Sequence, residues 1–248
     1  MTQHVLVTAG AAGIGLAIAR SFVEAGARVT ICDIDDGALA EASGLLDVTA
    51  HRADVADAAE VERLFAAIGA VDVLVNNAGV AGPVSGVEAT DPGDWARCFA
   101  VNVHGAFHAI RAAVPAMRAA GGGAIVNIST ASTLTGIPKR SAYVASKWAL
   151  EGLTRNLARE LGPDNIRVNA IRPGFMDTER MRGIIARIAG ERGIPAQEVE
   201  KEALGFISMR TKIQPEEIGA MALFLASEAG RHITGQIIGV DGNAEWEG

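Results

Sequence analysis

A tyrosine and a lysine stand four residues apart in the segment SAYVASK, as Tyr143 and Lys147. Tyr143 is the only tyrosine among the 248 residues. On a helix this spacing places both side chains on one face, and an ammonium beside a phenol stabilises the phenolate. Such a pair can exchange a proton with an alcohol or a carbonyl oxygen. An isolated pair of this kind is more often structural, so the neighbouring motifs must decide.

A glycine-rich turn, TAGAAGIG at residues 8–15, follows the first apolar run. Its spacing is G-x-x-G-x-G, which differs from the general G-x-G-x-x-G fingerprint of dinucleotide-binding proteins. Residues without a Cβ let the backbone approach a pyrophosphate. The N-terminus of the next helix offers free N–H groups to the phosphates. The predicted phosphate-binding residues are Gly10, Gly13, Ile14 and Gly15.

An aspartate ends the second predicted strand, since Asp33 follows Gly15 by 18 residues. A carboxylate at this place can accept hydrogen bonds from both ribose hydroxyls of adenosine and would repel a 2′-phosphate. The one basic residue near this pocket before Lys139 is Arg52, on the third predicted strand. The sequence therefore favours NAD over NADP, with Ile34 beside the adenosine.

Two further segments are expected beside the same dinucleotide. ADV ends the third predicted strand, and NNAG ends the fourth, next to the point where the strand order reverses. We expect Asp54 at the adenine amino group and Val55 over the ring. The remaining predicted cofactor contacts here are Asn76, Ala78 and Gly79.

Short apolar runs alternate with longer amphipathic stretches along the whole chain. Strands that read as continuous Val, Ile and Leu are buried on both faces, and helical crossovers between them make the sheet parallel. We predict an α/β fold, a doubly wound seven-stranded parallel sheet (Rossmann fold), in a single domain over residues 1–248. The predicted strands are 4–10, 27–35, 48–55, 71–79, 123–129, 166–174 and 235–242, and the predicted helices are 14–26, 35–46, 57–69, 94–119, 142–161 and 215–227. Residues 178–212 read as less regular.

The composition argues against several kinds of partner. The net charge is −7, so we expect neither nucleic acid nor an anionic membrane as a partner. No stretch approaches about 18 unbroken apolar residues, and the N-terminus shows no secretory signal, so a cytoplasmic protein is expected. Cys32 and Cys98 form no disulfide framework or metal motif. His104 and His108 lack a third ligand, so no metal site is predicted.

These motifs together resemble the short-chain dehydrogenase/reductase family, in its branch of about 250 residues. The resemblance runs from Val5 to Gly242 through TAGAAGIG, ADV, NNAG, VNVHGAF, IVNIST, YVASK, RVNAIRPG and ITGQIIGVDG. It implies a nicotinamide-dependent alcohol or carbonyl oxidoreductase acting on a small-molecule alcohol or ketone. The roles it implies are a general acid/base for Tyr143, its activation and a ribose contact for Lys147, a helix kink and a water relay for Asn102, and contacts to the carboxamide end of the cofactor for Pro173, Gly174, Met176 and Thr178.

The sequence departs from the family pattern at two places. The glycine-rich turn of the family begins Thr-Gly, whereas Thr8 is followed here by Ala9. The substrate-orienting serine of the family lies 13 residues before the tyrosine, where this chain has Thr130. A threonine hydroxyl can still bind a substrate oxygen, although its methyl group narrows the site. We assign the role to Thr130, with Ser132 as the alternative.

The substrate is expected among residues 131–140, 81–88 and 175–212, with a lid at about 178–212. The lid carries Arg180, Arg182, Arg187 and Arg192, which hint at an anionic substrate but also fit an ordinary charged helix surface. The resemblance further implies a homotetramer with two-fold symmetry. Two other functions stay open, an NADPH-dependent 3-oxoacyl reductase and a non-catalytic nucleotide-binding sensor. Asp33 argues against the first, and the Tyr143–Lys147 pair argues against the second.

Overall fold

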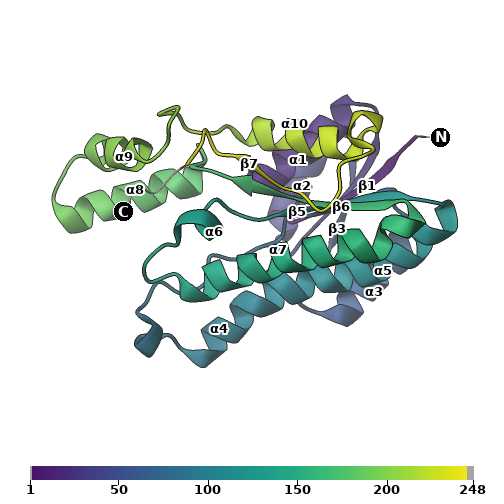
Figure 1. Cartoon of the computed structure of the whole chain (residues 1–248), viewed down its shortest axis with the longest axis horizontal. Coiled ribbons are helices and arrows are strands. Elements are labelled where there is room, and N and C mark those ends of the chain that lie inside the picture. The colour runs from purple at the N-terminus through teal and green to yellow at the C-terminus, as the bar shows by residue number, and fades with distance from the viewer. Residues whose placement is uncertain (1, 245–248) are drawn as a thin grey trace.

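The computed structural model describes residues 2–244. Its centre is a seven-stranded sheet in the order β3-β2-β1-β4-β5-β6-β7 (Figure 1), and every neighbouring pair is parallel. The strands are β1 (His4–Thr8), β2 (Arg28–Asp33), β3 (Val48–Arg52), β4 (Val73–Asn76), β5 (Gly123–Ile128), β6 (Ile166–Pro173) and β7 (Ile237–Val240). The order reverses at β1, which pairs with both β2 and β4. The predicted doubly wound seven-stranded parallel sheet is confirmed.

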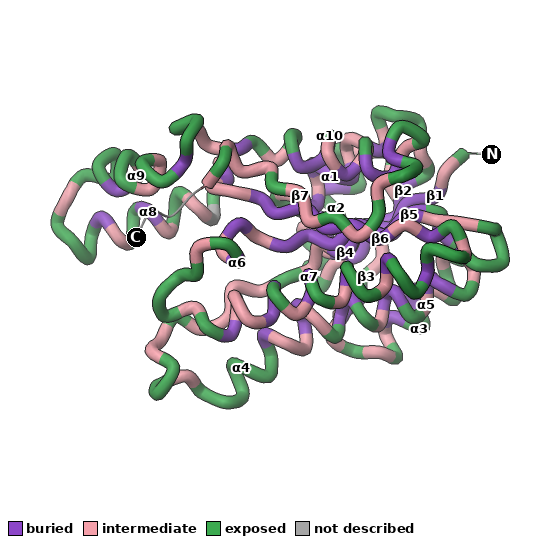
Figure 2. Tube along the Cα trace, viewed as in Figure 1, coloured by how far each residue is buried: buried purple, intermediate pink, exposed green. Residues whose placement is uncertain are grey.

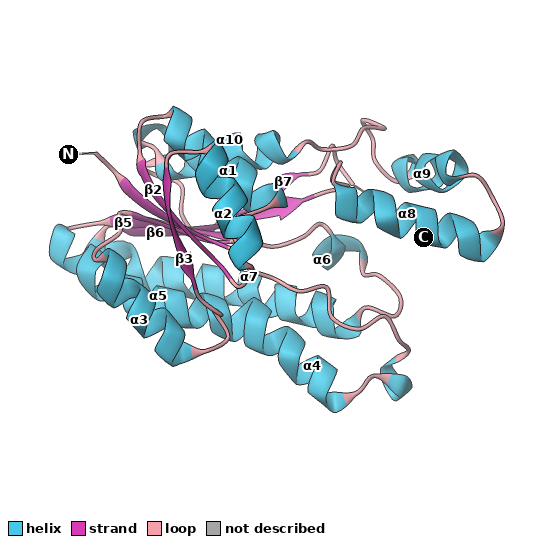
Figure 3. Cartoon of the chain, turned by 180° about the vertical axis from the view of Figure 1, so that it is seen from behind, coloured by secondary structure: helices cyan, strands magenta, loops and turns pink. Residues whose placement is uncertain are grey.

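Helices cover both faces of this sheet. The helices α1 (Gly13–Glu24), α2 (Asp36–Leu45) and α10 (Pro215–Ala226) lie on one face, as Figures 1 and 3 show from opposite sides. The other face carries α3 (Ala58–Ile68), α5 (Gly105–Ala120) and α7 (Ser141–Leu161). The short segments are η1 (Val87–Ala89), α6 (Ser132–Thr135), η3 (Gly162–Asp164) and η4 (Glu228–Gly230). Right-handed crossovers between parallel strands require this alternation of strand and helix.

Two apolar cores lie on opposite faces of the sheet. Figure 2 shows the buried residues concentrated along the strands and on the inner faces of the helices. Phe22 and Ile218 belong to the core beneath α1 and α10, while Met117 and Leu161 belong to the core beneath α5 and α7. All five residues of β1 are buried because side chains on both faces of the strand meet helices.

The predicted long helix over 94–119 is interrupted in the structure. It consists of α4 (Pro92–Phe99), a π-helical turn η2 (Ala100–His104) and α5. Asn102 lies in the middle of this turn. A π-helical turn inside a helix often marks a functional site because it redirects side chains. The sequence pattern alone gave a continuous helix, whereas the resemblance had placed a kink at Asn102.

Residues 178–212, predicted to be less regular, are largely helical in the structure. This segment forms two helices, α8 (Glu179–Arg192) and α9 (Ala196–Gly205), joined by a short turn. They bury a small apolar cluster of their own around Ile185, Ala189 and Val199. Figures 1 and 3 show the pair projecting from one end of the molecule, with α6 between it and α7.

Candidate active site

The glycine-rich turn between β1 and α1 is tightly packed. A Cβ on Gly10 would lie 2.7 Å from Ile31 Cγ2, and one on Gly15 would lie 2.1 Å from the Ala9 carbonyl oxygen. Gly13 has a positive φ of 53°, which L-residues rarely adopt. Ala9 also has a positive φ, 49°, so the alanine occupies a conformation that favours glycine. The turn keeps its shape despite the substitution, at a cost in backbone strain.

The N-terminus of α1 differs from those of the next three helices. Asp35, Asp57 and Asp91 cap α2, α3 and α4 by accepting hydrogen bonds from backbone N–H groups. In the described chain no side chain caps α1, whose N-cap is Ala12, and no acidic residue lies in its first turn. Uncapped N–H groups at the positive end of a helix dipole form an anion site. This end of α1 therefore fits a dinucleotide pyrophosphate.

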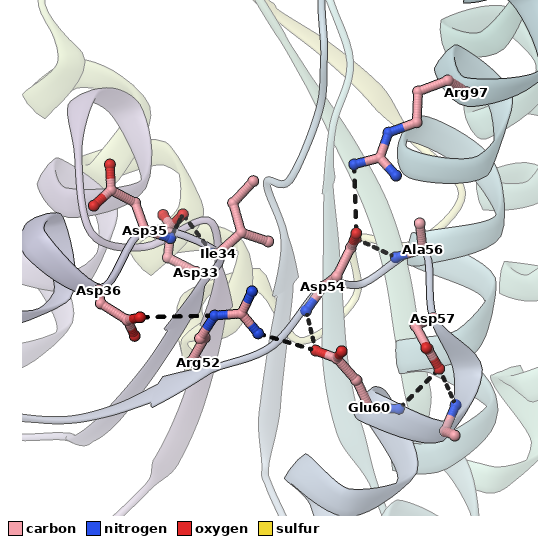
Figure 4. Close-up of polar contacts among 11 residues, drawn as sticks. Asp33, Ile34, Asp35, Asp36, Arg52, Asp54, Ala56, Asp57, Glu60 and Arg97 are labelled. Atoms are coloured by element: carbon pink, nitrogen blue, oxygen red, sulfur yellow. Dashed lines mark hydrogen bonds and ion pairs between the residues drawn. The ribbon is translucent and has the colours of Figure 1, made fainter. Parts of the chain in front are cut away.

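Asp33 lies at the end of β2, next to the glycine-rich turn. Its carboxylate accepts hydrogen bonds from the backbone N–H groups of Ile34, at 2.8 Å, and of Ala11 in the turn, at 3.4 Å. The carboxyl group is thereby fixed beside the glycine-rich turn. Arg52 is the cation that the sequence places nearest to a 2′-phosphate at this pocket. It lies 3.8 Å from carboxylate oxygens of both Asp36 and Glu60 (Figure 4). Its charge is therefore shared between two carboxylates.

Asp54 and Val55 follow β3 on the other side of this region. The Asp54 carboxylate accepts a hydrogen bond from Ala56 N at 2.9 Å and lies 3.4 Å from Arg97 Nη2, as Figure 4 shows. The Val55 side chain is buried, and a Cβ on Gly105 of α5 would lie only 2.6 Å from it. Val55 is therefore packed on α5, whereas Ile34 at the end of β2 is 55% exposed.

The NNAG segment contains one residue that sequence reasoning missed. Asn77 Nδ2 donates to the carbonyl oxygens of Thr8 and Ala9, at 3.1 and 3.0 Å, and so joins the end of β4 to the glycine-rich turn. The Thr8 hydroxyl accepts from the N–H groups of Asn77 and Ala78, each at 3.0 Å. The predicted residue Asn76 instead directs its amide into the core. Polar residues doubled at a strand end are the signal that could have pointed to Asn77.

Asn76 belongs to a buried chain of polar groups. Its Nδ2 donates to Asn127 Oδ1 at 2.8 Å, and Asn127 Nδ2 donates to the Thr154 hydroxyl at 2.9 Å. All three side chains are buried between β4, β5 and α7. This chain fixes the strands on which the site is built, so the Asn76 side chain has a structural place here.

Asn102 joins the π-helical turn to Val80, the residue that follows NNAG. Its Oδ1 accepts from Val80 N at 2.7 Å, and its Nδ2 donates to Val80 O at 3.0 Å and to the Ser146 hydroxyl at 2.9 Å. Ser146 in turn donates to the carbonyl oxygen of Tyr143 at 2.7 Å. Gly79 lies against this group, since a Cβ there would be 3.3 Å from both Asn102 Oδ1 and Lys147 Nζ. Asn102 therefore ties NNAG to the helix that carries the tyrosine.

The predicted catalytic pair begins helix α7. Lys147 is buried, and its ammonium donates to the carbonyl oxygen of Ile128, the last residue of β5, at 2.7 Å. Tyr143 lies one turn earlier on the same face and is partly exposed. The guanidinium of Arg140 lies 5.0 Å from the centre of the Tyr143 ring. The cationic Arg140, at the N-cap of α7, therefore lies beside the tyrosine ring, and Lys147 follows one helical turn after the tyrosine.

The two candidate substrate-orienting hydroxyls are in contact with each other. Thr130 Oγ1 donates to Ser132 Oγ at 3.0 Å and accepts a hydrogen bond from Ser132 N at 3.2 Å. Both residues lie in the segment after β5. The last residue of β5 is Ile128, whose carbonyl oxygen accepts the hydrogen bond from Lys147. The structure thus brings the two candidates together as one hydrogen-bonded pair.

The segment after β6 contains the residues predicted to contact the nicotinamide end of the cofactor. Gly174 is required by close packing, since a Cβ there would lie 2.5 Å from Asp241 Cα. The Pro173 carbonyl accepts from Ala131 N at 2.9 Å, which joins this segment to the loop after β5. Met176 is buried, and the Thr178 hydroxyl accepts from Met181 N as the N-cap of α8. These two predicted contacts therefore have structural places at the base of the helical pair.

Three of the lid arginines are engaged in ion pairs on the protein surface. Arg182 lies 2.8 Å from Asp177, Arg187 lies 2.7 Å from Glu191, and Arg192 lies 2.5 Å from Glu202. These contacts match the surface interpretation of their charges. His104 and His108 belong to no candidate metal site, because residues 2–244 contain no group of three or more His, Cys, Asp or Glu able to hold an ion.

Both cysteines are free and buried. Burial raises the pKa of the Cys32 thiol to about 12, and burial also raises the pKa of the Cys98 thiol. They act as small apolar side chains, as expected from the sequence. Within residues 2–244, no helix combines the length and apolarity needed to cross a bilayer.

Comparison with known proteins places this fold and site in a family. The sequence matches the family model for Enoyl-(Acyl carrier protein) reductase over residues 9–243. A solved short chain dehydrogenase/reductase family protein is 35% identical, with a TM-score of 0.86 over 97% of this chain and 96% of that one. The chain belongs to the short-chain dehydrogenase/reductase family. It is an oxidoreductase that uses a nicotinamide cofactor and acts on small-molecule substrates.

Relatives within the family differ in their named substrates. The D-beta-hydroxybutyrate dehydrogenase of Rhizobium meliloti is 36% identical, covering 98% of each chain. The trans-4-hydroxycyclohexanecarboxylate dehydrogenase of Sinomonas cyclohexanicum is 37% identical, covering 96% of this chain and 90% of that protein.

The solved structures differ in cofactor as well. NAD⁺-bound xylitol dehydrogenase has a TM-score of 0.89 at 30% identity, covering 97% of this chain and 98% of that one. An actinorhodin polyketide ketoreductase with NADPH has a TM-score of 0.92 at 28% identity, covering 97% and 96%. The choice between the two dinucleotides therefore has to be argued from this chain's own residues.

Proposed function

We propose that the chain is an NAD-dependent dehydrogenase that interconverts a secondary alcohol and a ketone, with Tyr143 as the general acid/base. The observation that carries the cofactor choice is Asp33, whose carboxylate is held beside the glycine-rich turn by the N–H groups of Ile34 and Ala11. A fixed carboxylate accepts ribose hydroxyls and repels a 2′-phosphate. Arg52 offers little compensation, because it is paired with two carboxylates.

The chain's own residues would bind the reactants and move the proton. When bound, the nicotinamide ring supplies or accepts the hydride. During oxidation the Tyr143 oxygen takes the proton of the substrate hydroxyl, while the Lys147 ammonium stabilises the phenolate and contacts the ribose. The hydroxyl pair of Thr130 and Ser132 orients the substrate oxygen, and Asn102 supports a water relay to solvent. The dinucleotide itself would contact Gly10, Gly13, Ile14, Gly15, Asp33, Ile34, Asp54, Val55, Ala78, Gly79, Pro173, Gly174, Met176 and Thr178.

We further propose a hydroxy carboxylic acid as the substrate class. The two relatives described above are named for hydroxybutyrate and for a hydroxycyclohexanecarboxylate. In this chain the guanidinium of Arg140 lies beside the ring of Tyr143, where it can meet a carboxylate on the reacting molecule.

The first test is NADH formation from NAD across hydroxy acids, polyols, cyclic alcohols and steroids. Turnover of hydroxy acids should fall at least about 100-fold in Tyr143→Phe, because acid/base catalysis contributes roughly that much. NADH binding should persist in this variant. Arg140→Gln should raise KM for hydroxy acids about tenfold and leave polyols unchanged, as expected when a charge-assisted hydrogen bond is lost.

The alternatives make different predictions in the same assay. An NADPH-dependent 3-oxoacyl reductase would reduce 3-oxoacyl thioesters and prefer NADPH, against the repulsion expected from Asp33. A nucleotide-binding sensor would bind NAD without turning over any member of the panel. Turnover that survives Tyr143→Phe would contradict the proposed mechanism.

We also propose a homotetramer in the cytoplasm. Trp95 on α4 is stacked on Phe99, and Phe107 on α5 is 49% exposed, so apolar surface is available on these helices for a second copy. Light scattering after size-exclusion chromatography should give four times the chain mass of 25.6 kDa. Cell fractionation checks the location. A monomer at micromolar concentration would contradict the assembly.

A further inference from the structure

A buried carboxylate lies outside the set of residues assigned to the reaction. Glu151 on α7 is fully buried, and its partner Arg172 on β6 is 9% exposed. Glu151 Oε1 accepts from Arg172 Nε at 2.8 Å, from the Ser129 hydroxyl at 2.6 Å and from the Thr133 hydroxyl at 2.8 Å. Oε2 accepts from Arg172 Nη2 at 2.5 Å. One carboxylate therefore joins three elements, α7, β6 and the segment after β5.

The contacts of this carboxylate lead directly to the orienting hydroxyls. The Thr133 hydroxyl oxygen also lies 2.9 Å from the carbonyl oxygen of Thr130, so its one hydrogen is shared between this oxygen and Glu151. Ser129 immediately precedes Thr130, and Thr133 immediately follows Ser132. The hydroxyl pair of Thr130 and Ser132 thus lies between two residues that Glu151 holds in place.

The same carboxylate is linked to the other two parts of the site. Arg172 precedes Pro173, whose carbonyl oxygen accepts from Ala131 N at 2.9 Å. Glu151 lies four residues after Lys147 and eight after Tyr143, on the same face of α7. Since a helix rises about 1.5 Å per residue, Glu151 is about 12 Å from the tyrosine along the helix. It cannot touch the reacting atoms and can act only through other residues.

Stability alone does not account for this pair. Two charges removed from water cost a desolvation penalty that their attraction often fails to offset, so apolar residues of similar volume would stabilise a protein as well. A fully satisfied buried polar network instead fixes one arrangement of the groups it contacts. The groups fixed here are the hydroxyl-bearing loop, the start of the segment after β6, and the helix of the acid/base.

We propose that Glu151, held by Arg172, is a positioning residue that sets the Thr130–Ser132 hydroxyl pair relative to the phenol of Tyr143. Thr133 and Ser129 transmit this constraint. The inference rests on the proposed function, because it takes these hydroxyls and Tyr143 as the reacting site. Small displacements of an orienting group carry large rate penalties, of the order of 100-fold for about 1 Å.

The test removes a link without removing the ion pair. Thr133→Val keeps the side-chain shape and deletes the hydroxyl that contacts Glu151. We expect kcat to fall about tenfold, a partial displacement on that scale, with KM for NAD within about twofold. Thr133→Ser keeps the hydroxyl and should restore most of the rate. The matched control is Thr30→Val, the same change at a buried hydroxyl of β2 that pairs with His4 Nε2 instead, at 2.9 Å; kcat should stay within about twofold.

Two further readouts separate positioning from a general loss of stability. With substrate deuterated at the reacting carbon, the isotope effect on kcat should rise in Thr133→Val, because misorientation slows the chemical step. Amide hydrogen exchange over residues 129–135 should also speed up in this variant and stay unchanged in Thr30→Val. An equal fall of kcat in both variants, or an unchanged kcat in Thr133→Val, would overturn the inference.

The outcomes of the two proposals remain distinguishable. If Thr133→Val fails to fold, Ser129→Ala removes the other link and carries the same expectations. If the wild-type protein turns over nothing, the proposed function fails, and the exchange experiment still decides whether Glu151 fixes the loop. Unchanged exchange in both link variants would then overturn the inference by itself.

Discussion

Replacing Ala9 by glycine should stabilise the protein, because this alanine lies in the left-handed region. Its φ is 49°, at the second position of the glycine-rich turn, where the family pattern has glycine. The residue is partly buried, and its carbonyl oxygen is held by Asn77 Nδ2 at 3.0 Å. The surrounding contacts impose this conformation whichever residue is present. The strain therefore persists in the native state and is absent from the unfolded chain.

The size of the effect follows from two opposing terms. An L-residue in the left-handed region costs roughly 1–2 kcal/mol relative to its ordinary conformation. Glycine loses more backbone entropy on folding, a penalty of about 0.5–1 kcal/mol relative to alanine. The difference is a net gain of about 0–1.5 kcal/mol for Ala9→Gly. For a chain of this size we expect Tm to rise by up to about 6 °C.

Urea unfolding at a fixed protomer concentration measures the free energy, since assembly makes stability concentration-dependent. The matched control is Ala25→Gly at the end of α1, where φ is −80°. The same substitution at that ordinary φ should destabilise by about 0.5–1 kcal/mol. The two variants are therefore predicted to have opposite signs. A loss of stability in both would refute the assignment of strain to Ala9.

Three other changes test different parts of the site. Asp33→Ser should lower the ratio of kcat/KM with NAD to kcat/KM with NADP about 10- to 100-fold, the equivalent of one or two hydrogen bonds to a charged group. Steady-state kinetics with both dinucleotides measure this ratio, and an unchanged ratio contradicts the cofactor assignment. Burial alone would raise the pKa of Glu151, but hydrogen bonds from Arg172, Ser129 and Thr133 outweigh it and leave the pKa below its usual range. The ionised Glu151 therefore stabilises the fold above about pH 4.3, and this stabilisation is lost as pH falls through the folded pKa. Glu151→Gln should remove this contribution to the pH dependence of the free energy of unfolding, measured in urea titrations. The variant should also lose about 3–5 kcal/mol of stability, because it leaves the buried Arg172 guanidinium without its charged partner. Gly15→Ala should destabilise by about 1–3 kcal/mol and weaken NADH binding, because its Cβ would lie 2.1 Å from a backbone carbonyl oxygen, whereas Gly44→Ala on α2, with nothing within 4 Å, should be neutral or stabilising.

The sheet was predictable because its strands are continuous apolar runs. β1, β4 and β5 are buried on both faces, and burial on both faces requires apolar residues at successive positions, a pattern that is visible in the sequence. The interruption at Asn102 was invisible to the residue pattern, because a π-helical turn inserts one residue without changing the apolar period noticeably. α8 and α9 were missed for another reason. They bury only a small cluster, so their apolar signal is weak among many surface charges.

Candidate site residues divide in the same way. Types and spacings pointed to Asp33, Tyr143 and Lys147, since each role requires a particular functional group near a strand or helix terminus. Spacing could not show that the Asn76 amide turns inward to Asn127, because neighbouring residues of a strand point to opposite faces and the register decides which one meets a ligand. Nor could it identify Asn77 as the link to the glycine-rich turn.

The helix α7 shows why such partners lie beyond sequence reasoning. Tyr143, Lys147 and Glu151 repeat every four residues, so the sequence places them on one face. The partners of the last two come from two different strands, since Lys147 meets the end of β5 and Glu151 meets Arg172 of β6. The parallel order of β5 and β6, with the crossover of α7 between them, is what brings these groups together. Apolar contacts tolerate exchange of similar volumes, whereas each buried donor or acceptor here requires its own partner. The polar face of α7 should therefore tolerate substitution less than the apolar core beneath it.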